Sequence, residues 1–274
     1  MSPENKADYP WETSREVERL QKQHAWVQRC LDSKIVFAPI PLDKEELKIL
    51  DVGCADGVLL RDLKKQVSPF AQLVGADIVE AFLPASEGGI HFEVYDLCES
   101  PRDELIGAFD LTHMRYSILG AAKVGYQKAI DHLASTVAPG GWLQVHELDF
   151  DPTDRPSVGP VWRDVSNLIA AMFDGMGSDC IRKLPGAFEA AGLENVTVHS
   201  VDLPMGKLLG DDEAAELSWQ PFVITIPSLI EGAKALGVRL PDSTYENLAE
   251  RFEKEVKEKG AMFRALVTIG QKPA

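Results

Sequence analysis

The stretch of the sequence with the clearest chemical potential is a glycine turn between an apolar run and a helix. Residues 48–57 read Lys-Ile-Leu-Asp-Val-Gly-Cys-Ala-Asp-Gly, with Gly53 and Gly57 in the turn. Glycines lack side chains, so the backbone can approach a ligand closely, and the N–H groups at the start of the helix face it. The spacing is not the G-x-G-x-x-G of dinucleotide sites. Because Asp51 and Asp56 would repel a pyrophosphate, the turn favours a cationic ligand.

Two more carboxylates stand where later strands are expected to end. Asp77 closes the run Leu-Val-Gly-Ala-Asp, and Asp96 follows the next apolar run. A carboxylate at the tip of a strand can accept hydrogen bonds from both hydroxyls of a ribose. Each acid alone could equally be a solvated loop residue or a helix cap. Three acids at successive strand ends are much more specific than one glycine turn.

The turn and the acids resemble the class I S-adenosylmethionine-dependent methyltransferases, whose first motif has the form D-x-G-x-G-x-G. The middle glycine is Ala55 here, a departure that is tolerated if this residue keeps a negative φ. In that family the turn holds the methionine part of the cofactor, whose amine and sulfonium are positive. The resemblance implies S-adenosylmethionine as the cofactor, with Asp77 on the ribose, Ile78 against the adenine and Asp96 on the adenine amino group. The implied cofactor-binding residues are Asp51, Gly53, Cys54, Asp77, Ile78, Asp96, Leu97 and His113.

A closer resemblance extends over most of the chain. Tyr-Pro-Trp at 9–11 and the segments 18–24, 109–115 and 138–147 resemble the fungal branch of secondary-metabolism methyltransferases, which includes the LaeA-like global regulators. The resemblance covers residues 9–150 well, the last strand more loosely and the segment between them only in outline. It therefore says more about the cofactor than about the substrate.

Short β-rich runs alternate with helical patterns along the chain. The expected strands are 47–52, 73–78, 91–95, 109–113, 142–146, 196–203 and 262–269, and helices are expected at 14–32, 57–67, 123–137, 157–177, 180–191, 211–236 and 243–258. Such alternation is typical of βαβ units with a parallel sheet covered on both faces. With the resemblance, it predicts an α/β fold: a Rossmann-like, doubly wound, seven-stranded sheet whose last strand is antiparallel, with helical cap insertions. Pro221 and Pro227 are expected to break the segment 211–236.

The expected organisation has three parts. Residues 1–45 form an N-terminal helical lid, because an apolar stripe follows one face of its helix. Residues 46–150 form the cofactor-binding α/β core. Residues 151–274 complete the core with a helix and the last two strands, and they carry helical substrate-cap insertions near 157–177 and 211–258.

Three titratable residues at the ends of the fourth and fifth expected strands are the candidates for catalysis. In a doubly wound sheet the ligand lies beyond the carboxyl ends of the strands, so His113, His146 and Glu147 should point toward it. His113 is equally consistent with a hydrogen-bonded core residue, whereas His146 or Glu147 could take a proton from the acceptor. Arg115 can either pair with the N-terminal helix or contact a ligand.

The expected substrate-binding residues are His24, Trp162, Phe173 and Trp219. His24 interrupts the apolar stripe of the first helix, where it is either a buried, hydrogen-bonded histidine or a lid residue above the cofactor. The aromatic residues have the spacing of helix cores. Because binding pockets are largely apolar, some of them should nonetheless line the acceptor pocket.

The composition limits the classes of partner. The chain has 274 residues, with 43 Asp plus Glu against 28 Lys plus Arg and a net charge of −15. This acidic excess argues against nucleic acids and anionic membranes, and no apolar stretch approaches the roughly 20 residues that span a bilayer. The four cysteines are widely separated and form no metal-binding motif. We therefore expect a cytoplasmic protein without a metal that acts on a small molecule and that can form a homodimer.

The function predicted from these residues is methyl transfer to a small, largely apolar secondary metabolite, with a hydroxyl oxygen as the favoured acceptor. Two alternatives stay open. One is a cofactor-binding regulator that acts through protein partners, which long disordered arms or a basic nuclear-import cluster would favour; the sequence has neither. The other is an enzyme that uses the sulfonium charge to steer a rearrangement, which the absence of a base near the acceptor would favour.

Overall fold

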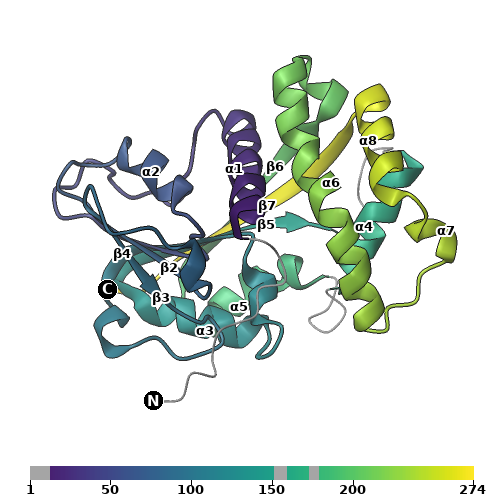
Figure 1. The fold of residues 1–274 in the computed structure, drawn as a ribbon. Coiled ribbons are helices and arrows are strands. Elements are labelled where there is room, and N and C mark those ends of the chain that lie inside the picture. Colours follow the sequence, from purple (N-terminus) through teal and green to yellow (C-terminus); the bar gives the residue numbers. More distant parts are fainter. Residues whose placement is uncertain (1–12, 151–158, 173–178) are drawn as a thin grey trace.

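A seven-stranded mixed sheet runs through the residues that the computed structural model describes, 13–150, 159–172 and 179–274 (Figure 1). The strands are β1 (Lys48–Val52), β2 (Gln72–Asp77), β3 (Ile90–Val94), β4 (Phe109–Arg115), β5 (Val137–Asp149), β6 (Glu194–Met205) and β7 (Ala261–Gln271), in the order β3-β2-β1-β4-β5-β7-β6. Strands β1 to β5 pair in parallel, whereas β7 is antiparallel to both β5 and β6. The predicted fold class, including the antiparallel last strand, is therefore confirmed.

Helices cover both faces of the sheet and gather beyond one end of it. They are α1 (Thr13–Cys30), α2 (Val58–Lys64), α3 (Tyr126–Thr136), α4 (Pro160–Met172), α5 (Cys180–Ala190), α6 (Asp212–Ala235), α7 (Asp242–Tyr245) and α8 (Leu248–Lys259). Figure 1 shows α2 on one side of the sheet, α3 and α5 on the other, and α4, α6, α7 and α8 together beyond its right-hand end. None of the described helices is long and apolar enough to cross a membrane.

The parallel register brings the carboxyl ends of β1 to β5 to one edge of the sheet. Asp51 of β1 pairs with Gly75 of β2 on one side and with His113 of β4 on the other. The chain fills the sheet in one direction from β1 to β3 and in the other from β4 onward, so the strand order reverses between β1 and β4. In open α/β sheets, ligands bind beside such a reversal. The register therefore determines where the site must lie.

An aromatic cluster joins α1 to the helices beyond the sheet. The rings of Trp162 in α4 and Phe263 in β7 meet edge to face with centroids 3.8 Å apart, and Phe222 of α6 lies 4.9 Å from Phe263. Trp26 of α1 packs 5.8 Å from Phe222, and its Nε1 donates a hydrogen bond of 2.8 Å to the carbonyl of Pro204. Trp26 and Trp162 are both fully buried. The C-terminal half of α1 is therefore part of the hydrophobic core.

Helix α6 corrects one expectation from the sequence. Pro221 and Pro227 do not break it, because the helix runs from Asp212 to Ala235 with both prolines inside. A proline within a helix removes a backbone hydrogen bond and costs about 3 kcal/mol. Burial of Phe222 and Ile226 against neighbouring helices offsets this cost. Tertiary packing, rather than local propensity, keeps α6 continuous.

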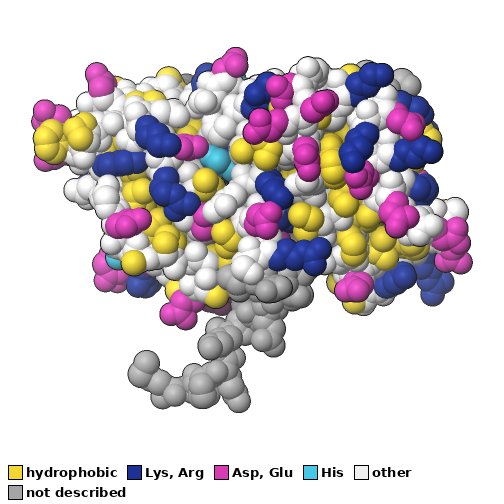
Figure 2. All heavy atoms as spheres, turned by 45° about the horizontal axis from the view of Figure 1, so that its top comes forward, with side chains coloured by type: hydrophobic (Ala, Val, Ile, Leu, Met, Phe, Trp, Pro, Cys, Tyr) yellow, Lys and Arg dark blue, Asp and Glu magenta, His cyan; other side chains and the backbone are white. Residues whose placement is uncertain are grey.

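The surface carries charges of both signs. On the face shown in Figure 2, acidic and basic side chains are interspersed with hydrophobic ones. Some surface charges pair along one helix or at its end, as in Lys22 with Glu18 and Lys65 with Asp62, each at 2.7 Å. Exposed pairs contribute only about 0–1 kcal/mol each. The stability of the fold therefore depends mainly on its buried apolar residues.

We predict that Trp162→Ala lowers the free energy of unfolding by about 3–5 kcal/mol, because it leaves a cavity beneath Phe263. Denaturant unfolding measures this change. Leu236→Ala is the control: its side chain is 68% exposed, so the change should stay within about 0.5 kcal/mol. Equal stabilities for the two variants would contradict a core role for Trp162.

Candidate functional site

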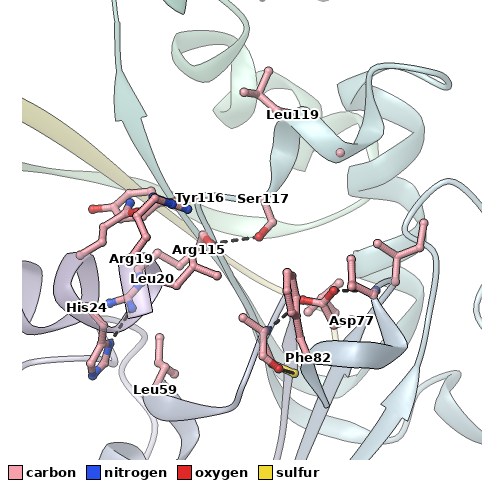
Figure 3. A pocket seen from close by; sticks show the side chains of 18 of the residues that line it. Arg19, Leu20, His24, Leu59, Asp77, Phe82, Arg115, Tyr116, Ser117 and Leu119 are labelled. Atoms are coloured by element: carbon pink, nitrogen blue, oxygen red, sulfur yellow. Dashed lines mark hydrogen bonds between the residues drawn. The ribbon is translucent and has the colours of Figure 1, made fainter. Parts of the chain in front are cut away.

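A cavity of about 420 Å³ lies at the carboxyl ends of β1 to β5, where the strand order reverses. Its wall combines the ends of these strands with residues of α1, α4 and α6. In Figure 3, Arg115, Tyr116 and His24 lie on one side of this space, and Asp77 and Phe82 lie on the other. The volume is within the range of about 300–1,000 Å³ for small-molecule sites. Lining residues that the sequence had indicated are His24, Asp51, Gly53, Cys54, Asp77, Ile78, Asp96, Leu97 and Glu147.

The glycine turn after β1 forms the floor of the cavity. Gly53 and Gly57 both have φ of +75°, and a Cβ at Gly53 would lie 2.1 Å from Oγ of Ser117. Only glycine therefore fits at this point of the turn. The sequence analysis expected a negative φ at Ala55, and this is wrong: its φ is +49°. Its N–H donates to Oδ2 of Asp77 at 2.9 Å, and this bond helps to hold a left-handed conformation that costs an L-residue about 1–2 kcal/mol.

Asp77 closes β2 with both carboxylate oxygens directed by backbone groups. Oδ2 accepts from the N–H of Ala55 and Oδ1 from the N–H of Val79, each at 2.9 Å. Burial raises the pKa of this carboxyl, and the two backbone bonds act in the opposite direction. Each oxygen can still accept one further hydrogen bond. This arrangement suits a ligand with two adjacent hydroxyls.

The end of β3 supplies the next wall of the cavity. Asp96 accepts a hydrogen bond from the N–H of Cys98 through Oδ1, at 2.8 Å. Ile78, which follows Asp77, is 45% exposed although it is apolar. Together with Leu97 it borders the same space. An exposed apolar surface beside a carboxylate suits a flat heterocycle that carries an amino group.

Asp51 and His113 form a buried pair on the neighbouring strands β1 and β4. Nδ1 of His113 lies 2.7 Å from Oδ1 of Asp51, and both side chains are almost completely buried. Asp51 lines the cavity, but His113 is not among its lining residues. The structure therefore corrects the expectation that His113 itself points into the crevice: it orients Asp51 from behind.

The two candidate bases on β5 have different positions. Glu147 lines the cavity, and its Oε1 accepts hydrogen bonds from the N–H groups of Ser117 (2.8 Å) and Ile118 (2.9 Å). Burial raises the pKa of this carboxyl to about 8 against these two bonds. His146 is not among the lining residues; its Nε2 lies 3.2 Å from the hydroxyl of Tyr116, which does line the cavity. His146 can therefore reach a ligand only through Tyr116, and the expectation of direct contact is corrected.

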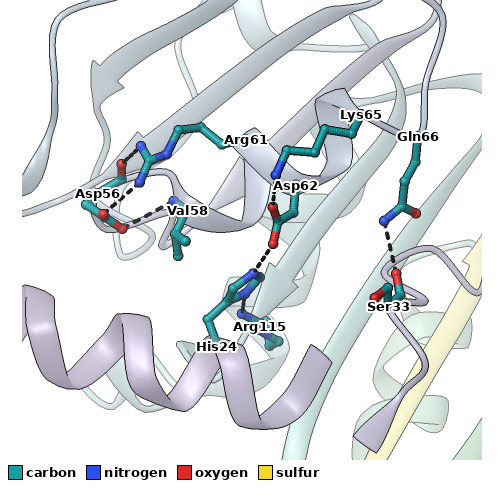
Figure 4. Close-up of polar contacts among 9 residues, drawn as sticks. All are labelled: His24, Ser33, Asp56, Val58, Arg61, Asp62, Lys65, Gln66 and Arg115. Carbon is teal, nitrogen blue, oxygen red and sulfur yellow. Dashed lines mark hydrogen bonds and ion pairs between the residues drawn. The ribbon is translucent and has the colours of Figure 1, made fainter. Parts of the chain in front are cut away.

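His24 joins the first helix to the core by side-chain bonds (Figure 4). Its Nδ1 lies 2.7 Å from Nη2 of Arg115, and its Nε2 lies 2.9 Å from Oδ2 of Asp62. Burial, reinforced by the positive charge of Arg115, lowers the pKa of His24 to about 4. Nearby, Nε2 of Gln21 donates to Oδ2 of Asp56 at 2.7 Å. The N-terminal part of α1 thus lies over the glycine turn and forms one wall of the cavity.

The other residues expected to bind substrate lie elsewhere. Trp162 belongs to the aromatic core, and Trp219 is buried beside Nζ of Lys257, 4.4 Å from the ring centroid. Neither lines the cavity, which corrects the expectation, and Phe173 lies outside the described residues. The apolar part of the cavity wall is formed instead by residues that follow β5 or lie on α4 and α6: Phe150, Ile169, Pro221, Phe222, Thr225 and Leu229. On α6 these follow one face with helical spacing, but only the packed structure shows which face that is.

Comparison with known proteins identifies the family. The family described as "Methyltransferase domain" matches residues 21–198. The chain belongs to this family. Methyltransferase psoC of Aspergillus fumigatus is 29% identical to it over 259 residues, which cover 94% of each protein. N-methyltransferase verN of Clonostachys rogersoniana is 25% identical over 268 residues, covering 94% of this methyltransferase and 90% of verN.

Two further matches bear on the branch and on the fold. Secondary metabolism regulator laeA of Coprinopsis cinerea is 29% identical over 162 residues, covering 53% of this methyltransferase and 36% of the regulator. With psoC, it confirms the predicted fungal secondary-metabolism branch. Among solved structures, Haemonchus contortus phosphoethanolamine N-methyltransferase 2 in complex with S-adenosyl-L-methionine has a TM-score of 0.51 at 13% identity, covering 93% of this chain and 53% of that one. This similarity confirms the Rossmann-like fold.

The residues of the cavity fit S-adenosylmethionine, the cofactor of this methyltransferase. The free lone pairs of Asp77 can accept hydrogen bonds from the ribose hydroxyls. The apolar surface of Ile78 and the carboxylate of Asp96 match an adenine with its amino group. The turn has no side chain at Gly53, so the methionine part of the cofactor can lie close to the backbone. Asp51 supplies negative charge for a cationic group.

We predict that Asp77→Ala weakens binding of S-adenosylhomocysteine by about 1.5–3 kcal/mol, or about 10- to 150-fold, because it removes hydrogen bonds to a charged acceptor. Titration calorimetry measures this change. Asp202→Ala serves as the control, because Asp202 lies in β6 with its side chain 60% exposed. A dissociation constant that is unchanged in Asp77→Ala would leave this residue with a structural role only.

Proposed function

We propose that this methyltransferase methylates a nitrogen atom of a small, largely apolar metabolite. The observation that carries the proposal is the composition of the cavity wall, where the apolar residues Phe150, Phe222 and Leu229 line the same space as Glu147. The relative verN is named an N-methyltransferase. An apolar wall also disfavours a charged ammonium, so an amine held there keeps its nucleophilic lone pair.

S-adenosylmethionine, when bound, supplies a methyl group activated by a sulfonium. The task of the protein is then to align the acceptor and to exclude water. We propose that α1 acts as the lid, that α4 and α6 shape the acceptor pocket, and that the strand-end residues from Asp51 to Leu97 hold the cofactor. A Cβ at Gly53 would clash with Ser117 and one at Gly57 with Phe92, so the glycines let the turn lie close to both side chains.

Glu147 is the group that we propose receives the proton of the acceptor. Its Oε1 is held by two backbone N–H groups, and no described residue bonds its Oε2. A carboxyl whose pKa lies near 8 is protonated below that pH and accepts a proton only above it. The positive charge of a bound cofactor stabilises the carboxylate and lowers this pKa. His146, whose Nε2 lies beside the Tyr116 hydroxyl, is a weaker base than Glu147, because burial keeps its pKa well below its ordinary value and the ring stays neutral.

Oxygen is the second candidate for the acceptor atom, and Glu147 is the observation that favours it. A hydroxyl must lose a proton as it attacks, whereas a neutral amine can lose it afterwards. The enzyme should be incubated with cofactor carrying a ¹³C-methyl group and a fungal small-molecule extract, and the product examined by NMR. We expect a carbon shift typical of N-methyl. An O-methyl signal would favour the second candidate, and label found in protein or nucleic acid would contradict the substrate class.

We predict that turnover at saturating cofactor rises with pH to a midpoint at or below about 8 and that Glu147→Gln removes this rise. The variant should lower kcat about 10²- to 10⁴-fold for a hydroxyl acceptor, which must lose its proton as it attacks, and less for an amine. Initial rates, measured at about every half pH unit between pH 5.5 and 9, test both effects. Glu189→Gln, on an exposed position of α5, is the matched control. A variant Glu147→Gln with the wild-type profile would exclude Glu147 as the base.

The raised pKa of Glu147 also predicts how the stability of the fold depends on pH, and this can be measured before the acceptor is known. The unfolded state releases the proton of Glu147 near pH 4.5, whereas the folded state keeps it to about pH 8. The folded state therefore binds more protons in this window, and its stability falls as the pH rises, by at most about 1.4 kcal/mol per pH unit. Denaturant unfolding between pH 5 and 8, at constant salt concentration, should show that the free energy of unfolding of the wild type falls with pH. In Glu147→Gln the free energy of unfolding should fall less. Parallel curves would contradict a raised pKa.

A further inference from the structure

Among the described residues, none forms an ion pair with the guanidinium of Arg115, a cation in the cavity wall. Arg115 is the last residue of β4 and lines the cavity. Within residues 13–150, 159–172 and 179–274, its side chain makes one hydrogen bond, from Nη2 to Nδ1 of His24, and no ion pair. Taking a charge out of water costs several kcal/mol unless an opposite charge or enough hydrogen bonds replace the water. An anionic group of a ligand bound in the cavity would therefore stabilise the guanidinium of Arg115.

His24 orients Arg115 but does not neutralise it. A guanidinium only donates hydrogen bonds, so Nδ1 of His24 must be the acceptor and the ring proton must sit on Nε2. Nε2 then donates to Oδ2 of Asp62, at 2.9 Å. This chain of bonds, drawn in Figure 4, holds the imidazole as a neutral ring between a cation and an anion. It uses one of the five N–H donors of Arg115, and no other side chain or backbone group in the described part of the chain accepts from the rest, so a ligand in the cavity can do so.

The surroundings of Arg115 indicate the chemistry of that ligand. Asp51 lines the same cavity on the adjacent strand and pairs in register with His113, two residues before Arg115. The wall thus presents a carboxylate and a guanidinium from neighbouring strand ends. An α-amino acid carries the complementary pair, an ammonium and a carboxylate on one carbon. Asp77, which suits a ribose, lies on the opposite side of the cavity in Figure 3.

We propose that Arg115 binds the carboxylate in the methionine part of the cofactor and that His24 of α1 positions the guanidinium for this contact. The lid helix then takes part in cofactor recognition without touching the reacting atoms. A planar guanidinium can hold a carboxylate through two parallel hydrogen bonds. A carboxylate on the acceptor is the other source of the same chemistry, and the test below separates the two. The proposal rests on the cofactor assignment and is independent of which acceptor atom is methylated.

The test compares S-adenosylmethionine with decarboxylated S-adenosylmethionine, which keeps the sulfonium and the amine and lacks only the carboxylate. Calorimetry on the full chain without acceptor should show that the wild type binds the complete cofactor about 10- to 100-fold more tightly. In Arg115→Met the two compounds should bind with dissociation constants that differ by less than about threefold, and the affinity for the decarboxylated compound should change little. His24→Ala should give an intermediate ratio, because the guanidinium keeps its charge but loses its orientation.

The controls make each outcome decisive. Arg29→Met removes an arginine from the outer side of α1, where the side chain is 55% exposed, and should keep the wild-type ratio. Arg115→Lys retains the charge without the planar fork and should lower the ratio only in part, which provides a test should Arg115→Met fail to fold. Equal binding of both compounds by the wild type would overturn the proposal. So would a ratio unchanged in Arg115→Met, which would assign Arg115 to the acceptor, or a parallel loss of both affinities, which would make it structural.

Discussion

Charge held out of water at the ends of five parallel strands is the constraint on which this site depends. Asp51, Asp77 and Glu147 are buried there in the wall of the cavity that Arg115 also lines. A buried carboxylate is tolerated only where hydrogen bonds replace its water, and each of the three has them: a histidine for Asp51 and pairs of backbone N–H groups for the others. Those backbone groups come from the turns after β1, β2 and β4. The turns, including the left-handed Ala55, are therefore shaped by the carboxylates that they satisfy.

The fold and the cofactor half of the site could be predicted because their signals are local. An apolar run that ends in an acid and a glycine turn places its functional atoms within a few residues, and parallel pairing then aligns the ends of neighbouring strands. Asp51, Gly53, Asp77 and Asp96 needed no knowledge of distant contacts. Which side chains of a strand face the cavity could not be predicted in this way. His146 and Glu147 are consecutive, so they point to opposite faces, and only the packing of β5 shows that Glu147 is the one that lines the cavity.

The acceptor half could not be predicted, since it depends on how helices far along the chain rotate about their axes. Trp219, Phe222 and Thr225 belong to one helix, yet the last two line the cavity and Trp219 does not. Successive residues point about 100° apart around a helix, so residues three apart, such as Trp219 and Phe222, differ by only about 60°. A small rotation of the helix therefore decides which of them faces the cavity. The prolines of α6 mislead for the same reason: their local cost is known, but the burial that offsets it comes from α1, α4 and α8. Large aromatic residues are therefore poor guides to the substrate when a core of their own is available.

Helix α1 connects these two halves, and its contacts change character along its length. Its C-terminal half is anchored by Trp26 and Val27 in the apolar core, whereas Gln21 and His24 hold the N-terminal half by hydrogen bonds to Asp56, Asp62 and Arg115. Local opening costs least where few apolar contacts are broken. The part of α1 above the glycine turn can therefore separate from the core more easily than the part beside α6. Opening at this end would break hydrogen bonds and leave the aromatic cluster of Trp26, Phe222 and Phe263 intact.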